Sequence, residues 1–187
     1  MEERTPITVQ GARLLLRPLT PAEIDDEWRE MLAADPMTIA ALPDEATFKA
    51  RLGRTGHLED GWLDLAIDLD GSCIGRIQTF VPPDRALPPG VFEVGIGLQA
   101  HARNRGHGRE ALALLTDWLF EHAGAVRVEA PTDPANVPMK RVFDHVGWEV
   151  VGPHHEFDRE WVMYAITREQ WAARHELRSR QLRRRGR

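Results

Sequence analysis

Cysteine, tyrosine and long apolar runs are scarce in this chain of 187 residues, which holds one cysteine and one tyrosine. With Cys73 alone, the chain cannot form an intramolecular disulfide framework, which is compatible with a reducing cytoplasm. No apolar run approaches the length that spans a membrane, and the first residues lack the basic-then-apolar layout of a signal peptide. We therefore expect a cytoplasmic protein without a membrane segment.

Charge of both signs is present but unevenly placed. The formal net charge is −5, and residues 174–187 hold seven arginines and one glutamate, which leaves −11 for residues 1–173. An acidic body suits a cationic partner, although acidic surfaces also simply keep proteins in solution. We expect one domain over residues 1–173, followed by an arginine-rich tail over residues 174–187 that could contact RNA or the ribosome.

Local signals indicate a single α/β domain. Thr20–Glu23 and Thr167–Gln170 are capping boxes that start helices, and Asp70-Gly71 is typical of a tight hairpin. The expected strands are 13–17, 62–69, 72–80, 91–98, 126–130, 148–151 and 161–166, with residues 152–158 as a polar turn. The expected helices are 21 to about 35, 44–52, 108–123, 137–146 and 168 into the tail. The order βααβββαβαββ, followed by a C-terminal helix, favours a mixed sheet flanked by helices.

The most informative stretch is 91–123. Apolar residues alternate with Glu93, Gly95 and Gly97, as in a strand with two unlike faces, and the sequence R-N-R-G-H-G then leads into an amphipathic helix. A strand, a glycine-rich turn and a helix N-terminus together form an anion site, because N–H groups of the first helical turn face the ligand.

Two glycine patterns compete for this region. The segment Gly95–Ala100 fits the dinucleotide fingerprint G-x-G-x-x-A, but a polar loop follows it and the required acidic residue falls inside the helix near Asp117. The second pattern, R-x-x-G-x-G at Arg103–Gly108, resembles motif A of the GCN5-related N-acetyltransferases (GNAT). That loop holds the pyrophosphate of acetyl-CoA.

The resemblance to this family covers nearly the whole chain. The opening L-L-L-R-P-L-T-P-A-E is similar to the branch that acts on ribosomal-protein N-termini. The segment N-V-P-M-K-R-V-F-D-H-V-G-W resembles N-x-x-S-x-x-x-Y-x-x-x-G-F, with Met139 in place of serine and Phe143 in place of a tyrosine that often serves as general acid. The resemblance implies the single-domain GNAT fold, with a mixed, mostly antiparallel sheet.

The resemblance also implies the residues that hold acetyl-CoA. Its phosphates would meet backbone N–H groups of residues 103–109, and its pantetheine arm would follow the backbone edge of residues 94–98, with Asn136 beyond. The implied binding residues are Val94, Ile96, Leu98, Arg103, Asn104, Arg105, Gly106, His107, Gly108, Arg109 and Asn136. Glycines at 106 and 108 allow close backbone approach or positive φ. They could also be loop punctuation, the arginines could be solvated, and His107 could merely fill a variable position.

Amine acetylation needs a neutral acceptor nitrogen. Neutralising an α-amino group at pH 7 costs about 1 kcal/mol, against roughly 4.6 kcal/mol for a lysine-like amine. Glu93 lies on the strand where the family often places its catalytic glutamate and is the candidate base, acting directly or through water. The alternative is a structural or solvent-facing glutamate. A thiolate leaving group with a pKa near ~8.5 needs little protonation, so the loss of tyrosine at Phe143 is tolerable and a water could protonate the sulfur.

No metal site is expected. His154, His155 and Glu156 are adjacent in a predicted turn without a third ligand at a standard spacing. His145 lies two residues after the tyrosine-like position and is not expected to replace the tyrosine, and Cys73 is expected in the core.

The sequence thus favours an acetyl-CoA-dependent N-acetyltransferase, monomeric or dimeric, in which a primary amine attacks directly in a ternary complex. The acceptor would be a small molecule or a peptide N-terminus. Segments 23–61 and 152–160 are expected to wall the acceptor site, and their carboxylates suggest a cationic acceptor. The alternatives are an acyl-CoA-binding regulator without turnover, and a protein that uses its basic tail to contact RNA.

Overall fold

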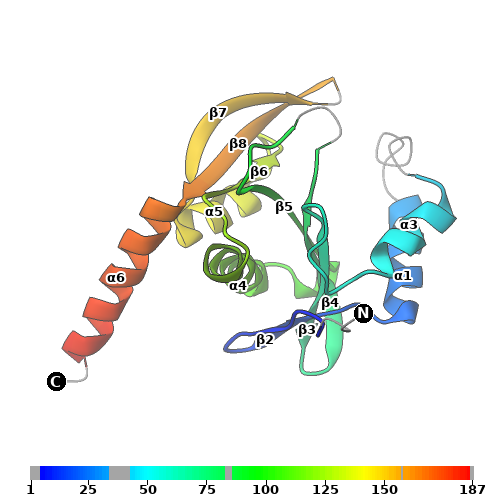
Figure 1. The fold of residues 1–187 in the computed structure, drawn as a ribbon, viewed down its shortest axis with the longest axis horizontal. Helices are drawn as coiled ribbons and strands as arrows, with labels where there is room; N and C mark the ends of the chain where they lie inside the picture. The colour runs from blue at the N-terminus through cyan, green and yellow to red at the C-terminus, as the bar shows by residue number, and fades with distance from the viewer. Residues whose placement is uncertain (1–4, 34–42, 83–85, 157, 186–187) are drawn as a thin grey trace.

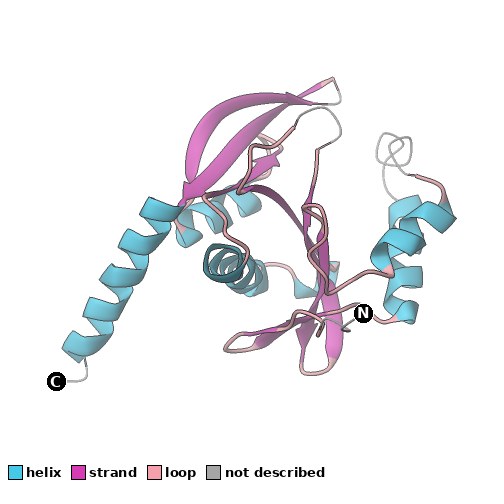
Figure 2. Ribbon diagram, in the orientation of Figure 1, coloured by secondary structure: helices cyan, strands magenta, loops and turns pink. Residues whose placement is uncertain are grey.

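The computed structural model describes residues 5–33, 43–82, 86–156 and 158–185, with side chains up to residue 177. Within these residues the chain forms an eight-stranded sheet in the order β1-β2-β3-β4-β5-β6-β8-β7 (Figures 1 and 2). The strands are β1 (Val9–Gln10), β2 (Leu14–Arg17), β3 (Leu63–Leu69), β4 (Ser72–Phe80), β5 (Val91–Leu98), β6 (Arg127–Thr132), β7 (Glu149–Glu156) and β8 (Arg159–Thr167). The helices are α1 (Pro21–Leu32), α3 (Glu45–Leu52), α4 (His107–His122), α5 (Val137–Val146) and α6 (Arg168–Arg185), with a short 3-10 turn, η1 (Ala100–Ala102).

The predicted α/β domain with a mixed, mostly antiparallel sheet is confirmed, since β5 and β6 form the one parallel pair among the described strands. Both capping boxes form: Glu23 N–H donates to Thr20 Oγ1 and Thr20 N–H to Glu23 Oε2, and Thr167 and Gln170 exchange the same two bonds. Asp70-Gly71 turns the β3–β4 hairpin with φ of 53° and 85°, which suits a residue that tolerates the left-handed region followed by glycine.

Helices cover both faces of the sheet (Figure 1). The larger core lies under α4 and α5, where residues such as Leu65, Ile77 and Leu115 are fully buried. A smaller core lies under α1 and α3, where Ile24 and Phe48 pack on the other face. Burying each such side chain contributes about 1.5–3 kcal/mol, so both helix layers are held firmly against the strands that carry the site.

The structure departs from the sequence predictions at several strands. The strand β6 continues through Pro131 instead of ending there. Beyond Glu129, β6 is no longer paired with β5, so the N–H that proline lacks is not needed for a hydrogen bond on that side. Residues 152–156, predicted as part of a turn, belong to β7. Because β7 is an edge strand paired only with β8, it tolerates Pro153, which has no N–H to donate. The two-residue strand β1 was not predicted, and the predicted end of the first helix falls at positions 35–36, outside the described residues.

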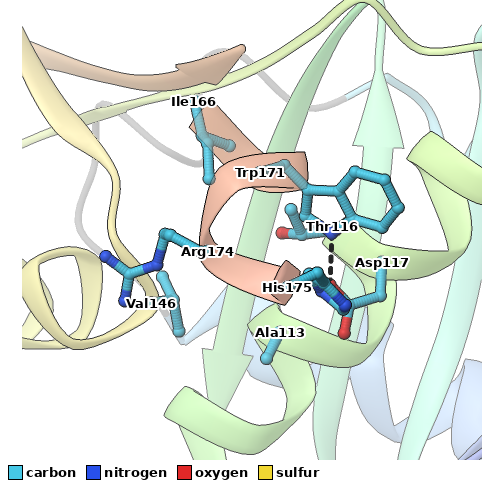
Figure 3. Close-up of a pocket in the computed structure, with 8 residues that line it drawn as sticks. All are labelled: Ala113, Thr116, Asp117, Val146, Ile166, Trp171, Arg174 and His175. Atoms are coloured by element: carbon cyan, nitrogen blue, oxygen red, sulfur yellow. Dashed lines mark hydrogen bonds and ion pairs between the residues drawn. The ribbon is translucent and has the colours of Figure 1, made fainter. Parts of the chain in front are cut away.

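The long helix α6 extends away from the body (Figure 1) and is held at its first turns. Asp117 of α4 accepts hydrogen bonds from Trp171 Nε1 at 2.7 Å and from His175 Nε2 at 3.0 Å, beside a cavity of about 10 Å³ that can hold at most one water (Figure 3). Arg174 Nη2 also donates to the backbone oxygen of His145 at 3.0 Å. The contacts of α6 with the body therefore extend past position 173, where we placed the domain boundary.

Among the described residues, no helix is both long and apolar enough to cross a membrane.

Candidate functional site

The two parallel strands at the centre of the sheet separate after three residue pairs. Their ladder joins Val91 to Arg127, Phe92 to Val128 and Glu93 to Glu129. From Val94 onward, β5 stays paired with β4 but has no strand partner on the β6 side among the described residues. This leaves a row of backbone N–H and C=O groups along Val94–Leu98 that can bind an extended ligand.

A helix N-terminus lies just past the end of this open edge. Gly106 is the N-cap of α4 with φ of 82°, and Asn104 has φ of 58°. No side chain caps α4, so the N–H groups of its first turn lack a capping acceptor. Together with the helix dipole, these groups form a site for an anion.

Arg13 brings a second element to this loop. Its Nε donates to Glu110 Oε2 at 2.9 Å and its Nη1 to the backbone oxygen of Arg105 at 3.3 Å. A Cβ built on Gly106 would lie 3.5 Å from Arg13 Nη2 and 3.9 Å from Arg109 Nη2. Two guanidinium groups therefore border the glycine. The sequence reading assigned Arg13 only to the first strand, since nothing local links it to a loop 92 residues away.

Glu110 fixes Arg13 in this position. Its carboxylate also accepts from the backbone N–H groups of Arg13 and Leu14. Burial acts to raise the pKa of Glu110, but these hydrogen bonds outweigh burial and the pKa lies below its usual value. Glu110 therefore stays ionised at neutral pH, so the contact from β2 to α4 persists there.

The other predicted loop residues divide into two groups. Arg103, Arg105 and Arg109 are all exposed, and Arg103 folds back so that its Nε donates to the backbone oxygen of Leu98 at 2.8 Å. His107 is buried, with Nδ1 3.2 Å from the backbone oxygen of Ala102. The ring of His107 thus packs inward, so His107 can offer a ligand at this loop only its backbone.

Asn136 is the N-cap of α5. Its Oδ1 accepts from the backbone N–H of Met139 at 3.1 Å, and its side chain is exposed on the β6 side of the site. Because Oδ1 is used by the cap, the amide nitrogen is the group that remains for a ligand.

Glu93 lies at the point where the strands separate. Its exposed fraction is 0%, so the solvent-facing alternative is wrong. Its neighbour across the parallel ladder is Glu129, which is 4% exposed and accepts from Arg127 Nε at 2.7 Å. Residues in register on parallel strands point to the same face, so two carboxylates gather here. The sequence reading missed Glu129, because the pairing depends on strand register.

A polar network continues from this point across the same face of the sheet. Arg76 on β4 forms ion pairs with Glu27 of α1 (Nε–Oε2, 2.9 Å) and Asp64 of β3 (Nη1–Oδ1, 2.6 Å). Arg76 Nη1 also donates to Gln78 Oε1 at 2.6 Å. Burial raises the pKa of Glu27 in spite of the nearby guanidinium. The network places α1 over the strand next to β5.

Phe143, at the tyrosine-like position, lies in the core. It is fully buried and stacks on Trp148 and Tyr164, with ring centroids 5.1 and 4.6 Å apart. Burial raises the pKa of Tyr164. His145 is exposed and its Nδ1 lies 3.0 Å from the backbone oxygen of Arg141. Neither Phe143 nor His145 is therefore arranged as a proton donor at the strand separation.

Residues 154–156 lie in β7, not in a turn. Among the described residues, no group of three or more histidine, cysteine, aspartate or glutamate side chains could hold a metal ion. Cys73 is half-buried against the smaller core, and burial raises the pKa of its thiol.

Several carboxylates of the predicted acceptor walls form ion pairs. Lys49 pairs with Asp25 and Glu45 at 2.7 Å each, and Arg54 pairs with Glu59 at 3.4 Å. Asp26 pairs with Arg29, and Glu27 with Arg76. These ion pairs occupy the carboxylates at short range, while the net charge of residues 23–61 stays negative.

The family model described as "Acetyltransferase (GNAT) domain" matches residues 13–149, which include the separated strands, the loop and α4. The chain belongs to the GNAT acetyltransferase family. It is an acetyltransferase that uses acetyl-CoA, as the motif at Arg103–Gly108 predicted. Comparison with curated proteins finds no match.

Solved structures place this GNAT enzyme beside several relatives of the same fold. An acetyltransferase from Agrobacterium tumefaciens is 24% identical with a TM-score of 0.67, covering 88% of this chain and 96% of its own. RimJ from Mycobacterium smegmatis, solved with CoA-disulfide, is 23% identical with a TM-score of 0.69, covering 91% and 95%. The aminoglycoside acetyltransferase AAC(6')-Ib, solved with coenzyme A, is 19% identical with a TM-score of 0.68, covering 86% and 98%. At these identities the likeness shows the fold alone.

Proposed function

We propose that this GNAT enzyme acetylates a primary amine, with a protein N-terminus as the acceptor, by direct attack of the amine in a ternary complex with acetyl-CoA. The observation that carries the proposal is the line formed by three features. An uncapped helix N-terminus lies at one end, the unpaired edge of β5 lies in the middle, and the buried carboxylates of Glu93 and Glu129 lie at the other end.

The loop fits the phosphates of acetyl-CoA. Backbone N–H groups of Gly108 and Arg109 and the guanidinium of Arg13 border Gly106, whose missing Cβ leaves the backbone accessible. The exposed side chains of Arg105 and Arg109 can add charge to the same site.

The open strand edge fits the extended arm. From Leu98 to Glu93 the strand rises roughly 17 Å, and its backbone groups alternate as donors and acceptors for amides running alongside. The side chains of Val94, Ile96 and Leu98 pack against the core under α4 and hold this edge straight. Asn136, exposed at the start of α5, is the side chain proposed to border the arm on its far side.

Glu93 is proposed as the proton acceptor. Acetyl-CoA supplies an activated thioester carbonyl, and the acceptor nitrogen must lose a proton to attack it. A buried carboxylate beside the attack point can take that proton directly or through a water. Expulsion of a thiolate with a pKa near ~8.5 needs no dedicated acid, which agrees with the burial of Phe143 in the core.

Two arguments favour an α-amino group as the acceptor: the free energy of neutralising the amine, and the carboxylates beside the proposed attack point. An α-amino group costs about 1 kcal/mol to neutralise at pH 7, and a lysine-like amine roughly 4.6 kcal/mol. The structural relatives include RimJ and aminoglycoside acetyltransferases, so both peptide and antibiotic amines belong in the test. Contact with the carboxylates of Glu93 and Glu129, not attraction by the walls, would hold the cationic form before proton loss.

The experiment is an amine-dependent CoA-release assay with acetyl-CoA against a panel of N-terminal peptides, polyamines and aminoglycosides, followed by mass analysis of the product. We expect an acetyl group on the α-amine of a peptide. Binding of acetyl-CoA without release of CoA on any amine would favour the alternative of a non-catalytic regulator. Contact of the arginine tail with RNA, and a monomeric or dimeric state, remain predictions of the sequence.

A further inference from the structure

Gln78 occupies a defined place beside the proposed attack point. In the β4–β5 ladder Gln78 is opposite Gly95, and Phe80 is opposite Glu93. Gln78 and Glu93 are therefore diagonal neighbours on one face, at a Cα separation of roughly 7–8 Å that long side chains bridge. A Cβ built on Gly95 would lie 3.2 Å from Gln78 Nε2, so the glycine leaves this amide nitrogen uncovered over the strand.

The amide of Gln78 can point in only one direction. Its oxygen accepts from Arg76 Nη1 at 2.6 Å, and a guanidinium has no acceptor that could receive an N–H instead. Arg76 in turn is fixed by Glu27 and Asp64, with a side chain only 11% exposed. The amide nitrogen of Gln78 must therefore face away from Arg76, and it makes no hydrogen bond with the residues that the structure describes.

The face thus offers one hydrogen-bond donor next to two carboxylates. A positively charged or neutral amine suits the carboxylates, and an oxygen acceptor suits the Gln78 amide. In a peptide N-terminus the amine nitrogen and the first carbonyl oxygen are three bonds apart, so roughly 3 Å separates them. Polyamines carry no such oxygen, and the hydroxyls of an amino sugar can donate as well as accept.

We propose that Gln78 is a specificity-determining residue whose Nε2 donates to the first carbonyl oxygen of a peptide acceptor, held in orientation by Arg76 and Glu27. The inference rests on the proposed amine acetylation and narrows its acceptor to an amine with an adjacent carbonyl. Gln78 positions the acceptor and takes no proton, so its role shows in discrimination between acceptors.

The test compares two acceptors in three enzymes. The acceptors are a short peptide and its (E)-alkene isostere, in which a carbon–carbon double bond replaces the first peptide bond and removes the carbonyl oxygen. The enzymes are the wild type, Gln78→Met and Gln78→Glu. Differences in amine pKa between the acceptors cancel, because both are measured in every enzyme. Gln78→Glu keeps an oxygen for Arg76 but has no N–H to donate, and thermal melting of each variant checks the fold.

We expect both variants to lower kcat/KM for the peptide about tenfold more than for the isostere, which corresponds to ~1.4 kcal/mol. The inference would be overturned if the variants lost kcat/KM by the same factor on both acceptors. It would also be overturned if Gln78→Glu preferred the peptide over the isostere as strongly as the wild type does. A wild type that acetylates only amines without an adjacent carbonyl would overturn both the inference and the protein N-terminus as acceptor, and would leave amine acetylation itself standing. A wild type that releases CoA with no amine at all contradicts the proposed function itself.

Discussion

Glu93 of β5 and Glu129 of β6 are direct neighbours in the parallel ladder, at its last pair before the two strands separate. Both residues are at least 96% buried. Two carboxylates so placed repel each other in the absence of a cation, and Arg127 pairs with Glu129 at 2.7 Å. Arg127 balances the charge of Glu129, and the proposed role of Glu93 is to take the proton of the acceptor amine.

Replacing Glu93 by glutamine should slow acetylation most at low pH. A base is needed least where the amine is already neutral, so we expect kcat/KM for a peptide acceptor to fall about a hundredfold at pH 6.5 and far less at pH 9. The KM for acetyl-CoA should change little. Glu149→Gln is the matched control, since Glu149 lies in β7 of the same sheet and is held by Gln170 at 2.8 Å. A loss by the same factor at both pH values would make Glu93 structural.

The phosphate loop can be tested with two glycines of one helix. Gly106 precedes α4 with φ of 82°, and Gly124 follows it with φ of 69°. Valine at either position strains the backbone by about 1–2 kcal/mol, but only Gly106→Val places a side chain beside Arg13. Acetyl-CoA should raise the melting temperature of the wild type and of Gly124→Val, and not that of Gly106→Val. Equal shifts in all three proteins would move the phosphate site elsewhere.

The elements whose signals lie within a few adjacent residues were predicted correctly from the sequence. Both capping boxes, the Asp70-Gly71 hairpin and the loop at Arg103–Gly108 carry their signals within a few adjacent residues, and each element formed where expected. The prediction of a turn at residues 152–156 was wrong, because glycine, proline and histidine also fit an edge strand that is paired on one side only.

The remaining parts of the site depend on register and on distant contacts. Glu129 meets Glu93 through a parallel pairing, and Gln78 is oriented by Arg76 only because α1 brings Glu27 over the sheet. Arg13 reaches Glu110 across 97 positions. No periodicity or spacing in one sequence encodes such pairs, so they required the folded structure.

Acid should weaken the contact between β2 and α1. Hydrogen bonds from Arg17 lower the pKa of Glu23 from 4.5 to about 2, and its side chain is 17% exposed. A lowered pKa gives stability that is present above pH 4.5 and is lost as the pH falls toward 2. Glu23→Gln should therefore cost about 1–3 kcal/mol at pH 7 and little near pH 2.5, measured by urea unfolding.

The control for this experiment is Glu45→Gln, which removes an exposed partner of Lys49 and should change stability little. If the effect of Glu23→Gln is the same at both pH values, the ion pair with Arg17 is not its cause.

Two truncations separate the docked part of α6 from the arginine tail. A chain ending after Leu177 keeps the contacts of Trp171, Arg174 and His175 with the body, whereas one ending after Ala173 loses two of them. At about 1 kcal/mol for each hydrogen bond, the shorter chain should melt several degrees lower and the longer one like the full protein. If the tail contacts RNA, the chain that ends after Leu177 should already lose the salt-dependent binding, because it lacks residues 178–187. Equal melting of the two truncations would mean that α6 does not dock as described.

The most direct measurement is the initial rate of CoA release from acetyl-CoA as both acetyl-CoA and a peptide with an unblocked N-terminus are varied. The account predicts release that requires the peptide, an acetyl group on its α-amine, and intersecting lines in the double-reciprocal plot, as direct attack in a ternary complex demands. Parallel lines would contradict direct attack. CoA release that is independent of every amine, or acetyl-CoA binding with no release at all, would contradict the assignment of this chain as an N-acetyltransferase.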